Sequence, residues 1–130
     1  MTESRFQDQV AIVTGAANGI GLAITRRLLE EGARVAACDV DIKAGRHLAD
    51  QVGDRQRLLF VETDVASEIS AQAATAAVAR HFGHVDILIN NAGIFPNKRF
   101  EEISYADWRR VLAVNLDRSE ERRVGKECRL

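Results

Sequence analysis

Three glycines within eight residues, Thr14-Gly15-Ala16-Ala17-Asn18-Gly19-Ile20-Gly21, form the segment of this chain that is best suited to bind an anion. Four apolar residues, 10–13, precede it, and residues 22–29 follow with the apolar spacing of a helix. A strand that turns through glycines into a helix leaves the first N–H groups of the helix without intrahelical partners. Glycine lets a phosphate approach the backbone, and the helix dipole favours negative charge. The segment therefore predicts a diphosphate site.

A carboxylate follows the next apolar segment, residues 34–38. This is Asp39, which lies 18 residues beyond Gly21. A carboxylate near this spacing accepts hydrogen bonds from the adenosine ribose of a dinucleotide, and it would repel a 2′-phosphate. No lysine or arginine follows Asp39 before Lys43. We therefore expect NAD rather than NADP as the cofactor; the alternative is that Asp39 caps a helix, a position for which Asp41 is better placed.

Polar residues also follow two later apolar segments. Asp64 and Val65 come after residues 58–61, and the quartet Asn90-Asn91-Ala92-Gly93 comes after residues 85–89. Ligands of an open parallel sheet bind beyond the carboxyl ends of its strands, which makes all of these positions candidates. Asp64 alone is equally typical of a turn. Two amides after a buried strand need hydrogen-bond partners, so a structural role for them is also open.

A further amide, Asn115, lies in the last predicted helix, residues 104–116. The apolar side chains Trp108, Val111 and Leu112 have i, i+3, i+4 spacing, and Asn115 continues their stripe. We therefore expect this amide to face the interior. The alternative to a functional role is a buried structural asparagine whose hydrogen bonds are made to neighbouring groups.

Short apolar segments alternate with helical ones along the chain, which predicts a parallel sheet with helices on both faces. The expected strands are residues 10–13, 34–38, 58–61 and 85–89, and the expected helices are 20–31, 42–52, 68–82 and 104–116. Asp41, Ser67 and Ser104 are the expected N-caps of the last three helices. The helix at 68–82 is expected to bury Ile69, Ala73, Ala76 and Ala77.

The composition is that of one globular domain: 130 residues, of which 46% are hydrophobic and 28% charged. A net charge of −1 lacks the basic excess that is typical of proteins that bind nucleic acid or anionic membranes. No apolar run is long enough to span a bilayer, and the N-terminus lacks the apolar core of a signal peptide. We therefore expect a cytoplasmic protein with reduced cysteines and, because its three histidines do not cluster, no metal site.

Three motifs resemble the short-chain dehydrogenase/reductase family: the T-G-x-x-x-G-x-G turn at residues 14–21, the N-N-A-G quartet at 90–93, and the Val114-Asn115-Leu116 segment. The resemblance implies an α/β fold, a Rossmann-type doubly wound parallel sheet of strand order 3-2-1-4, here truncated before its later strands. It also implies an oxidoreductase that transfers a hydride between NAD and a small-molecule alcohol or carbonyl substrate, working as a homo-oligomer.

The resemblance also assigns roles to individual residues. Asp64 would lie near the adenine amino group, Asn91 would tie the central strands together, and Asn115, the one catalytic residue expected within the chain, would hold a water linked to a catalytic lysine. The residues expected to bind the cofactor are Thr14, Gly15, Asn18, Gly19, Ile20, Gly21, Asp39, Asp64, Val65, Asn90, Asn91, Ala92 and Gly93.

The family's catalytic serine and Tyr-x-x-x-Lys pair are expected to lie beyond this chain. Tyr105 and Arg109 have the spacing of the pair, but the lysine is missing and they precede Asn115. The chain by itself is therefore predicted to be inactive. Two alternatives are a non-catalytic dinucleotide-binding or regulatory module and an NADP-dependent 3-oxoacyl thioester reductase; the second needs basic residues near the ribose.

Residues 118–130 differ in character from the rest of the chain. They contain three apolar residues without a periodic face, and twelve consecutive residues resemble the conceptual translation of a short-read sequencing adapter. The prediction is an incomplete dinucleotide-binding domain over residues 1–117 with a non-native tail; the alternative is a charged helical tail.

Overall fold

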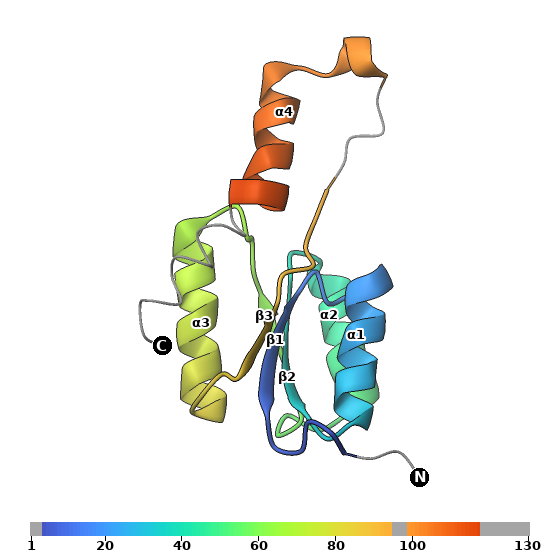
Figure 1. Ribbon diagram of the computed structural model, residues 1–130, viewed down its shortest axis with the longest axis vertical. Helices are drawn as coiled ribbons and strands as arrows, with labels where there is room; N and C mark the ends of the chain where they lie inside the picture. Colours follow the sequence, from blue (N-terminus) through green and yellow to red (C-terminus); the bar gives the residue numbers. More distant parts are fainter. Residues whose placement is uncertain (1–3, 95–98, 118–130) are drawn as a thin grey trace.

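The computed structural model describes residues 4–94 and 99–117 and shows a parallel sheet of four strands with helices on both faces (Figure 1). The strand order is β3-β2-β1-β4, and every pairing is parallel, which confirms the predicted fold. In chain order the elements are β1 (Val10–Thr14), α1 (Gly19–Glu30), β2 (Arg34–Asp39), α2 (Ile42–Val52), β3 (Leu58–Glu62), α3 (Glu68–Phe82), β4 (Ile87–Ile89), the 3-10 turn η1 (Phe100–Glu102), α4 (Tyr105–Leu112) and the π-helical turn η2 (Ala113–Asp117). The predicted non-native tail lies outside the described residues.

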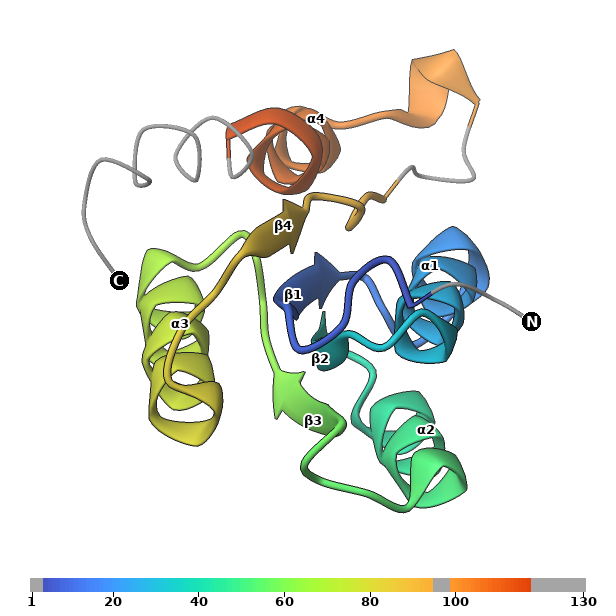
Figure 2. The ribbon, with the colours of Figure 1, turned by 60° about the horizontal axis from the view of Figure 1, so that its bottom comes forward.

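Two layers of helices enclose the sheet. In Figure 2, α1 and α2 cover one face and α3 covers the other. Successive residues of a strand point to opposite faces, so β1 and β2 contribute to both cores. One core contains Ala11, Val13, Val35, Ala37, Leu28 and Leu48, and the other contains Val10, Ile12, Ala36, Cys38, Val78 and Phe82. Over the described residues, no helix has both the length and the apolar character that crossing a bilayer requires.

The buried face of α3 differs from the predicted one. Ala71, Ala74, Val78 and Phe82 are its buried residues, whereas Ile69 is 80% exposed. Ala73 and Ala76 are also exposed, and Ala77 is half-buried. The two largest apolar side chains near the end of the helix, Val78 and Phe82, decide which face turns inward, because they remove far more apolar area from water than alanines do. The prediction failed because alanines on every side of α3 left its phase undetermined.

Three helices begin as predicted, with a side chain as the N-cap. The carboxylate of Asp41 accepts from Ala44 N–H, and the hydroxyl of Ser67 accepts from Ser70 N–H. Ser104 and Asp107 form a reciprocal capping box at the start of α4. Such caps satisfy helix N–H groups that have no intrahelical partner. They also fix where α2, α3 and α4 begin.

A buried carboxylate joins the N-terminal segment to the end of α1. Glu31 is 1% exposed; it accepts from Nε and a terminal nitrogen of Arg5 and, at 2.8 Å, from Nε of Arg27. Its backbone carbonyl accepts from Phe6 N–H. The hydrogen bond from Arg5, reinforced by Arg27, holds the pKa of the Glu31 carboxyl below its ordinary value although burial acts in the opposite direction. The charged carboxylate therefore favours the folded state.

We expect Glu31→Gln to lower the stability of the fold at neutral pH. A carboxyl whose pKa is lowered by folding stabilises the protein above its unfolded pKa, and this contribution is lost as the pH falls through the folded pKa. The difference in urea midpoint between the parent and the variant should therefore close on acidification from about pH 7 to about pH 3. Glu30→Gln, at the exposed neighbouring position, is the control; an equal loss of stability in both variants would contradict the assignment.

Candidate dinucleotide site

The ends of β1 and β4 are joined by side chains at the carboxyl edge of the sheet. The Oγ1 atom of Thr14 accepts from the N–H groups of Asn91 and Ala92, both at 3.0 Å, and donates to Ile89 O at 3.3 Å. The side-chain nitrogen of Asn91, Nδ2, donates to Thr14 O at 3.1 Å and to Gly15 O at 3.3 Å. These bonds continue the pairing beyond Val13 and Ile89, where the ladder ends. The predicted structural role of Asn91 is therefore present in the fold.

The glycine turn has the backbone geometry that its sequence predicts. Gly15 and Gly19 have φ values of +64° and +58°, in the left-handed region that favours glycine. Gly21 is needed for a different reason: a Cβ there would lie 2.1 Å from Gly15 O and 2.5 Å from Nδ2 of Asn91. This close approach packs the first turn of α1 against the end of β1. The turn and the start of the helix therefore pack together and form one cradle, residues 14–21.

The N-terminus of α1 is open to an anion. Asn18 occupies the N-cap position with extended backbone, but its side chain makes no cap hydrogen bond, and the first turn contains no acidic residue. Leu22 N–H, bonded to Asn18 O at 3.3 Å, begins the helical ladder, so the N–H groups of residues 19–21 precede it. Among the four α-helices of the described ranges, α1 alone lacks a side-chain cap. Gly19 and Ile20 are exposed, whereas Gly21 is buried. N–H groups without intrahelical partners and the helix dipole together favour a bound anion.

Asp39 contacts this cradle directly. Its Oδ2 accepts from Ala17 N–H at 2.9 Å, and its Oδ1 accepts from Asp41 N–H at 3.0 Å. A carboxylate has about four acceptor positions, so both oxygens retain capacity for ribose hydroxyls. The contact with Ala17 was not predicted, because a backbone N–H in a loop gives no signal in the residue pattern.

Asp64 and Val65 lie beyond the end of β3, as predicted. The side chain of Asp64 is exposed, and its Oδ1 accepts from Ala66 N–H at 3.0 Å, which is the turn role that the sequence left open. Thr63, which the sequence did not single out, is 4% exposed and donates its N–H to Asp39 O at 2.9 Å. This bond continues the pairing of β2 and β3 toward the cradle.

Asn115 does not face the interior as predicted. The residue is exposed and lies in the π-helical turn η2, and Trp108 of the expected stripe is 56% exposed. No residue of α4 is buried, so its apolar stripe provides no interior for Asn115 to face. Its Oδ1 accepts from Ile94 N–H at 2.8 Å, and its Nδ2 donates to Ile94 O at 2.7 Å. Asn115 therefore fixes the segment after β4.

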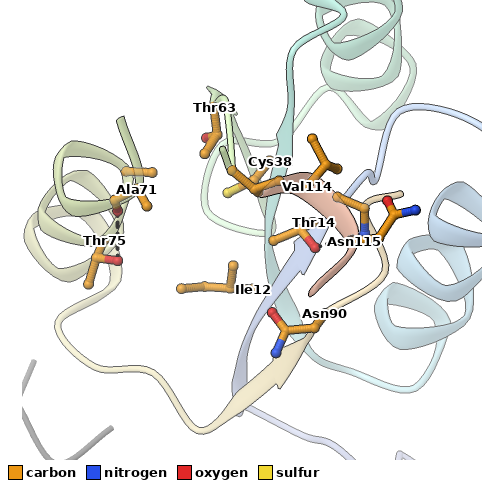
Figure 3. Close-up of a pocket in the computed structure, with 12 residues that line it drawn as sticks. Ile12, Thr14, Cys38, Thr63, Ala71, Thr75, Asn90, Val114 and Asn115 are labelled. Carbon is orange, nitrogen blue, oxygen red and sulfur yellow. Dashed lines mark hydrogen bonds between the residues drawn. The ribbon is translucent and has the colours of Figure 1, made fainter. Parts of the chain in front are cut away.

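A small cavity lies on the α3 side of the same edge (Figure 3). Its volume is about 70 Å³, and five predicted site residues line it: Thr14, Val65, Asn90, Ala92 and Asn115. A space of this size admits a few water molecules. The cavity therefore lies between the predicted site residues at this edge of the sheet and Ala71, Ala74 and Thr75 of α3.

The structure brings the predicted residues together at one edge. The glycine turn, Asp39, Asp64-Val65 and Asn90–Gly93 follow the ends of the four parallel strands. A diphosphate fits this set, because α1 presents uncapped N–H groups at a glycine turn, and the absence of a Cβ at Gly21 lets that turn lie close to the end of β1. No group of three or more metal-ligating side chains occurs within residues 4–94 and 99–117.

Comparisons with known proteins agree with this fold. D-threitol dehydrogenase of Mycolicibacterium smegmatis is 46% identical over 113 residues, which cover 86% of this chain and 44% of that protein. The 3-beta-hydroxysteroid dehydrogenase of Comamonas testosteroni is 41% identical over 114 residues, with coverages of 88% and 44%. The chain therefore spans less than half the length of these relatives.

Solved structures give the same result. A 3-ketoacyl-(acyl-carrier-protein) reductase from Brucella melitensis, complexed with NADH, matches with a TM-score of 0.82 and 33% identity over 88% of this chain and 47% of that one. A short-chain dehydrogenase/reductase from the same organism, described as a glucose/ribitol dehydrogenase, matches with a TM-score of 0.85 and 32% identity over 92% of this chain and 50% of that one. The family model described as short chain dehydrogenase matches residues 9–118. The chain thus belongs to the short-chain dehydrogenase family.

Proposed function

We propose that this chain is the cofactor-binding part of an NAD-dependent oxidoreductase that interconverts an alcohol and a ketone or aldehyde. The observation that carries the proposal is the uncapped start of α1 behind a glycine turn in which Gly21 packs on Gly15. The D-threitol and 3-beta-hydroxysteroid dehydrogenases are named for oxidation of hydroxyl compounds. The substrate proposed for this protein is accordingly a small-molecule alcohol or carbonyl compound.

Each part of the dinucleotide has a candidate partner. The N–H groups of Gly19, Ile20 and Gly21 would hold the diphosphate, Asp39 the adenosine ribose, and Asp64 with Val65 the adenine. The segment Asn90–Gly93 would line the rest of the cofactor beside Thr14. When bound, NAD supplies the hydride acceptor, and the protein supplies binding, orientation and electrostatics.

Asp39 supports NAD over NADP. Its carboxylate is fixed by Ala17 N–H and Asp41 N–H at the point where the chain turns from β2 toward α2. A 2′-phosphate placed there would meet a like charge at short range, and Asp41 adds a second carboxylate. The nearest following basic residue, Lys43, lies within α2.

The proton-transfer groups are proposed to lie in the rest of the full-length protein. A tyrosine has an unperturbed pKa near 10 and acts as a base at neutral pH only when a neighbouring cation lowers it. The neighbouring cation would be the lysine of the family's catalytic pair. The proposed role of Asn115 is to hold a water that connects this lysine to solvent, and its two hydrogen bonds to Ile94 fix its position for that purpose. A Tyr-x-x-x-Lys pair downstream of Asn115 would favour the enzyme over the non-catalytic binding module.

Titration of the full-length protein with NADH and NADPH tests the proposal. We expect saturable binding, with NADH bound more tightly, and NAD-dependent oxidation of at least one member of a panel of secondary alcohols. Binding without turnover, in a sequence that lacks the Tyr-x-x-x-Lys pair, would select the binding module. A folded protein that binds neither dinucleotide would refute both.

A further inference from the structure

The residue at the N-cap position of α1 directs its side chain away from the helix. Asparagine is among the best N-caps, and Asn18 has the extended backbone, with φ −143° and ψ 158°, that a cap residue adopts. Its amide nitrogen nevertheless donates to Oδ2 of Asp41 at 3.2 Å, and no cap bond forms. The side chain best placed to occupy the anion site is thus held by a neighbouring turn.

Asp41 is fixed for this task by two further bonds. Its Oδ1 accepts from Ala44 N–H at 3.0 Å, as the N-cap of α2, and its own N–H donates to Asp39 Oδ1. The Ala44 N–H, followed by the Asn18 amide, keeps the pKa of the Asp41 carboxyl below its ordinary value, so the acceptor is charged at neutral pH. Figures 1 and 2 show α1 and α2 side by side on one face of the sheet. One carboxylate therefore caps its own helix and engages the cap residue of the other.

We propose that Asp41 is a positioning residue that keeps Asn18 from capping α1, so that the first N–H groups of that helix stay available to the diphosphate. The inference rests on the proposed function. A free Asn18 side chain would bond to the N–H of Ile20 or Gly21, the positions that a cap satisfies. The ligand would then have to displace this bond before it could bind.

Asp41→Ser separates the two roles of the carboxylate. Serine caps a helix about as well as aspartate, so α2 keeps its N-cap, but the second oxygen that holds Asn18 is lost. NADH affinity should fall about fivefold, the equivalent of one cap hydrogen bond. Simple electrostatics predicts the opposite sign, because the substitution removes a negative charge beside an anion site.

A double-mutant cycle with Asn18→Ala provides the matched control. Alanine cannot cap, so with Ala at position 18 the fall in NADH affinity on Asp41→Ser should disappear, leaving only the electrostatic gain from removal of the negative charge. An equal fall in both backgrounds, an unchanged affinity or a rise in the single variant would overturn the inference. Calorimetric titration of the full-length variants with NADH gives all four affinities, and urea unfolding checks that each is folded.

Amide hydrogen exchange without ligand keeps this test separate from that of the proposed function. In the Asp41→Ser variant the freed Asn18 should cap α1 and slow exchange at Ile20 or Gly21, whereas exchange in the Asn18→Ala variants should stay fast. Unchanged protection in the Asp41→Ser variant overturns the role of Asp41 even if NADH binds. Slowed exchange in a protein that does not bind NADH would instead support the role of Asp41 and refute the proposed cofactor.

Discussion

Replacement of Gly21 by alanine should lower NADH affinity at least about tenfold and destabilise the fold by about 1–3 kcal/mol, the usual cost of overpacking. The new Cβ would lie 2.1 Å from Gly15 O and 2.5 Å from Asn91 Nδ2. The first of these atoms belongs to the backbone of the cradle, and the second belongs to the bond network that joins β1 to β4. Helix α1 must therefore move away from the strand, or the turn must open.

Gly83→Ala is the matched control for this substitution. Gly83 has φ +88° at the end of α3, and nothing lies within 4 Å of a Cβ built there. Alanine at this position costs only backbone strain, about 1–2 kcal/mol, far from the proposed site. Urea unfolding and NADH titration of both variants separate strain from site geometry. A Gly21→Ala protein with the affinity and stability of the parent would show that this contact does not shape the cradle.

The second large effect is expected in cofactor preference. Removing the carboxylate of Asp39 should lower the ratio of the NADP dissociation constant to the NAD dissociation constant on the order of a hundredfold. The reason is that a contact between like charges at short range costs about 3 kcal/mol. Asp39→Ala also leaves the N–H of Ala17, a residue that is 5% exposed, without its acceptor. The affinity for both cofactors should therefore fall, because the cradle loses this bond, while the ratio of the two affinities changes.

Asp39→Asn distinguishes these two contributions. The amide oxygen can still accept from Ala17 N–H, whereas the charge is gone. This variant should show the changed ratio with a smaller loss of NAD affinity than Asp39→Ala. Parallel titrations with NAD and NADP measure both quantities, and an unchanged ratio in both variants would remove Asp39 from its assigned role.

Much of the fold could be predicted from sequence because several local signals agree. Apolar runs mark the strands, and Asp41, Ser67 and Ser104 mark helix starts. Two of the three family motifs, at residues 14–21 and 90–93, follow strands in the expected order. The phase of α3 could not be predicted, because alanines on all sides give nearly equal burial for several faces. The exposure of Asn115 could not be predicted, because apolar spacing indicates a stripe but does not show that no residue of α4 is buried.

The sequence predicts which residues lie at the carboxyl edge of the sheet, but it does not predict the hydrogen bonds between them. The glycine spacing and the position of Asp39 after a strand identify the edge of the sheet. The contacts Asp39 to Ala17, Asp41 to Asn18 and Asn115 to Ile94 each involve backbone groups or residues about 20 apart in the chain. Such contacts depend on how the strands are aligned with one another, and only the assembled sheet determines this.

The unfinished first turn of α1 has a consequence for the lifetime of the protein. A ligand that binds the folded state alone adds RT ln(1 + [L]/Kd) to the free energy of unfolding, so an anion that completes the helix also reinforces the fold. Molecules without nucleotide would unfold more often and would be the ones that proteases degrade. The supply of nucleotide would in this way set the abundance of the protein as well as its occupancy.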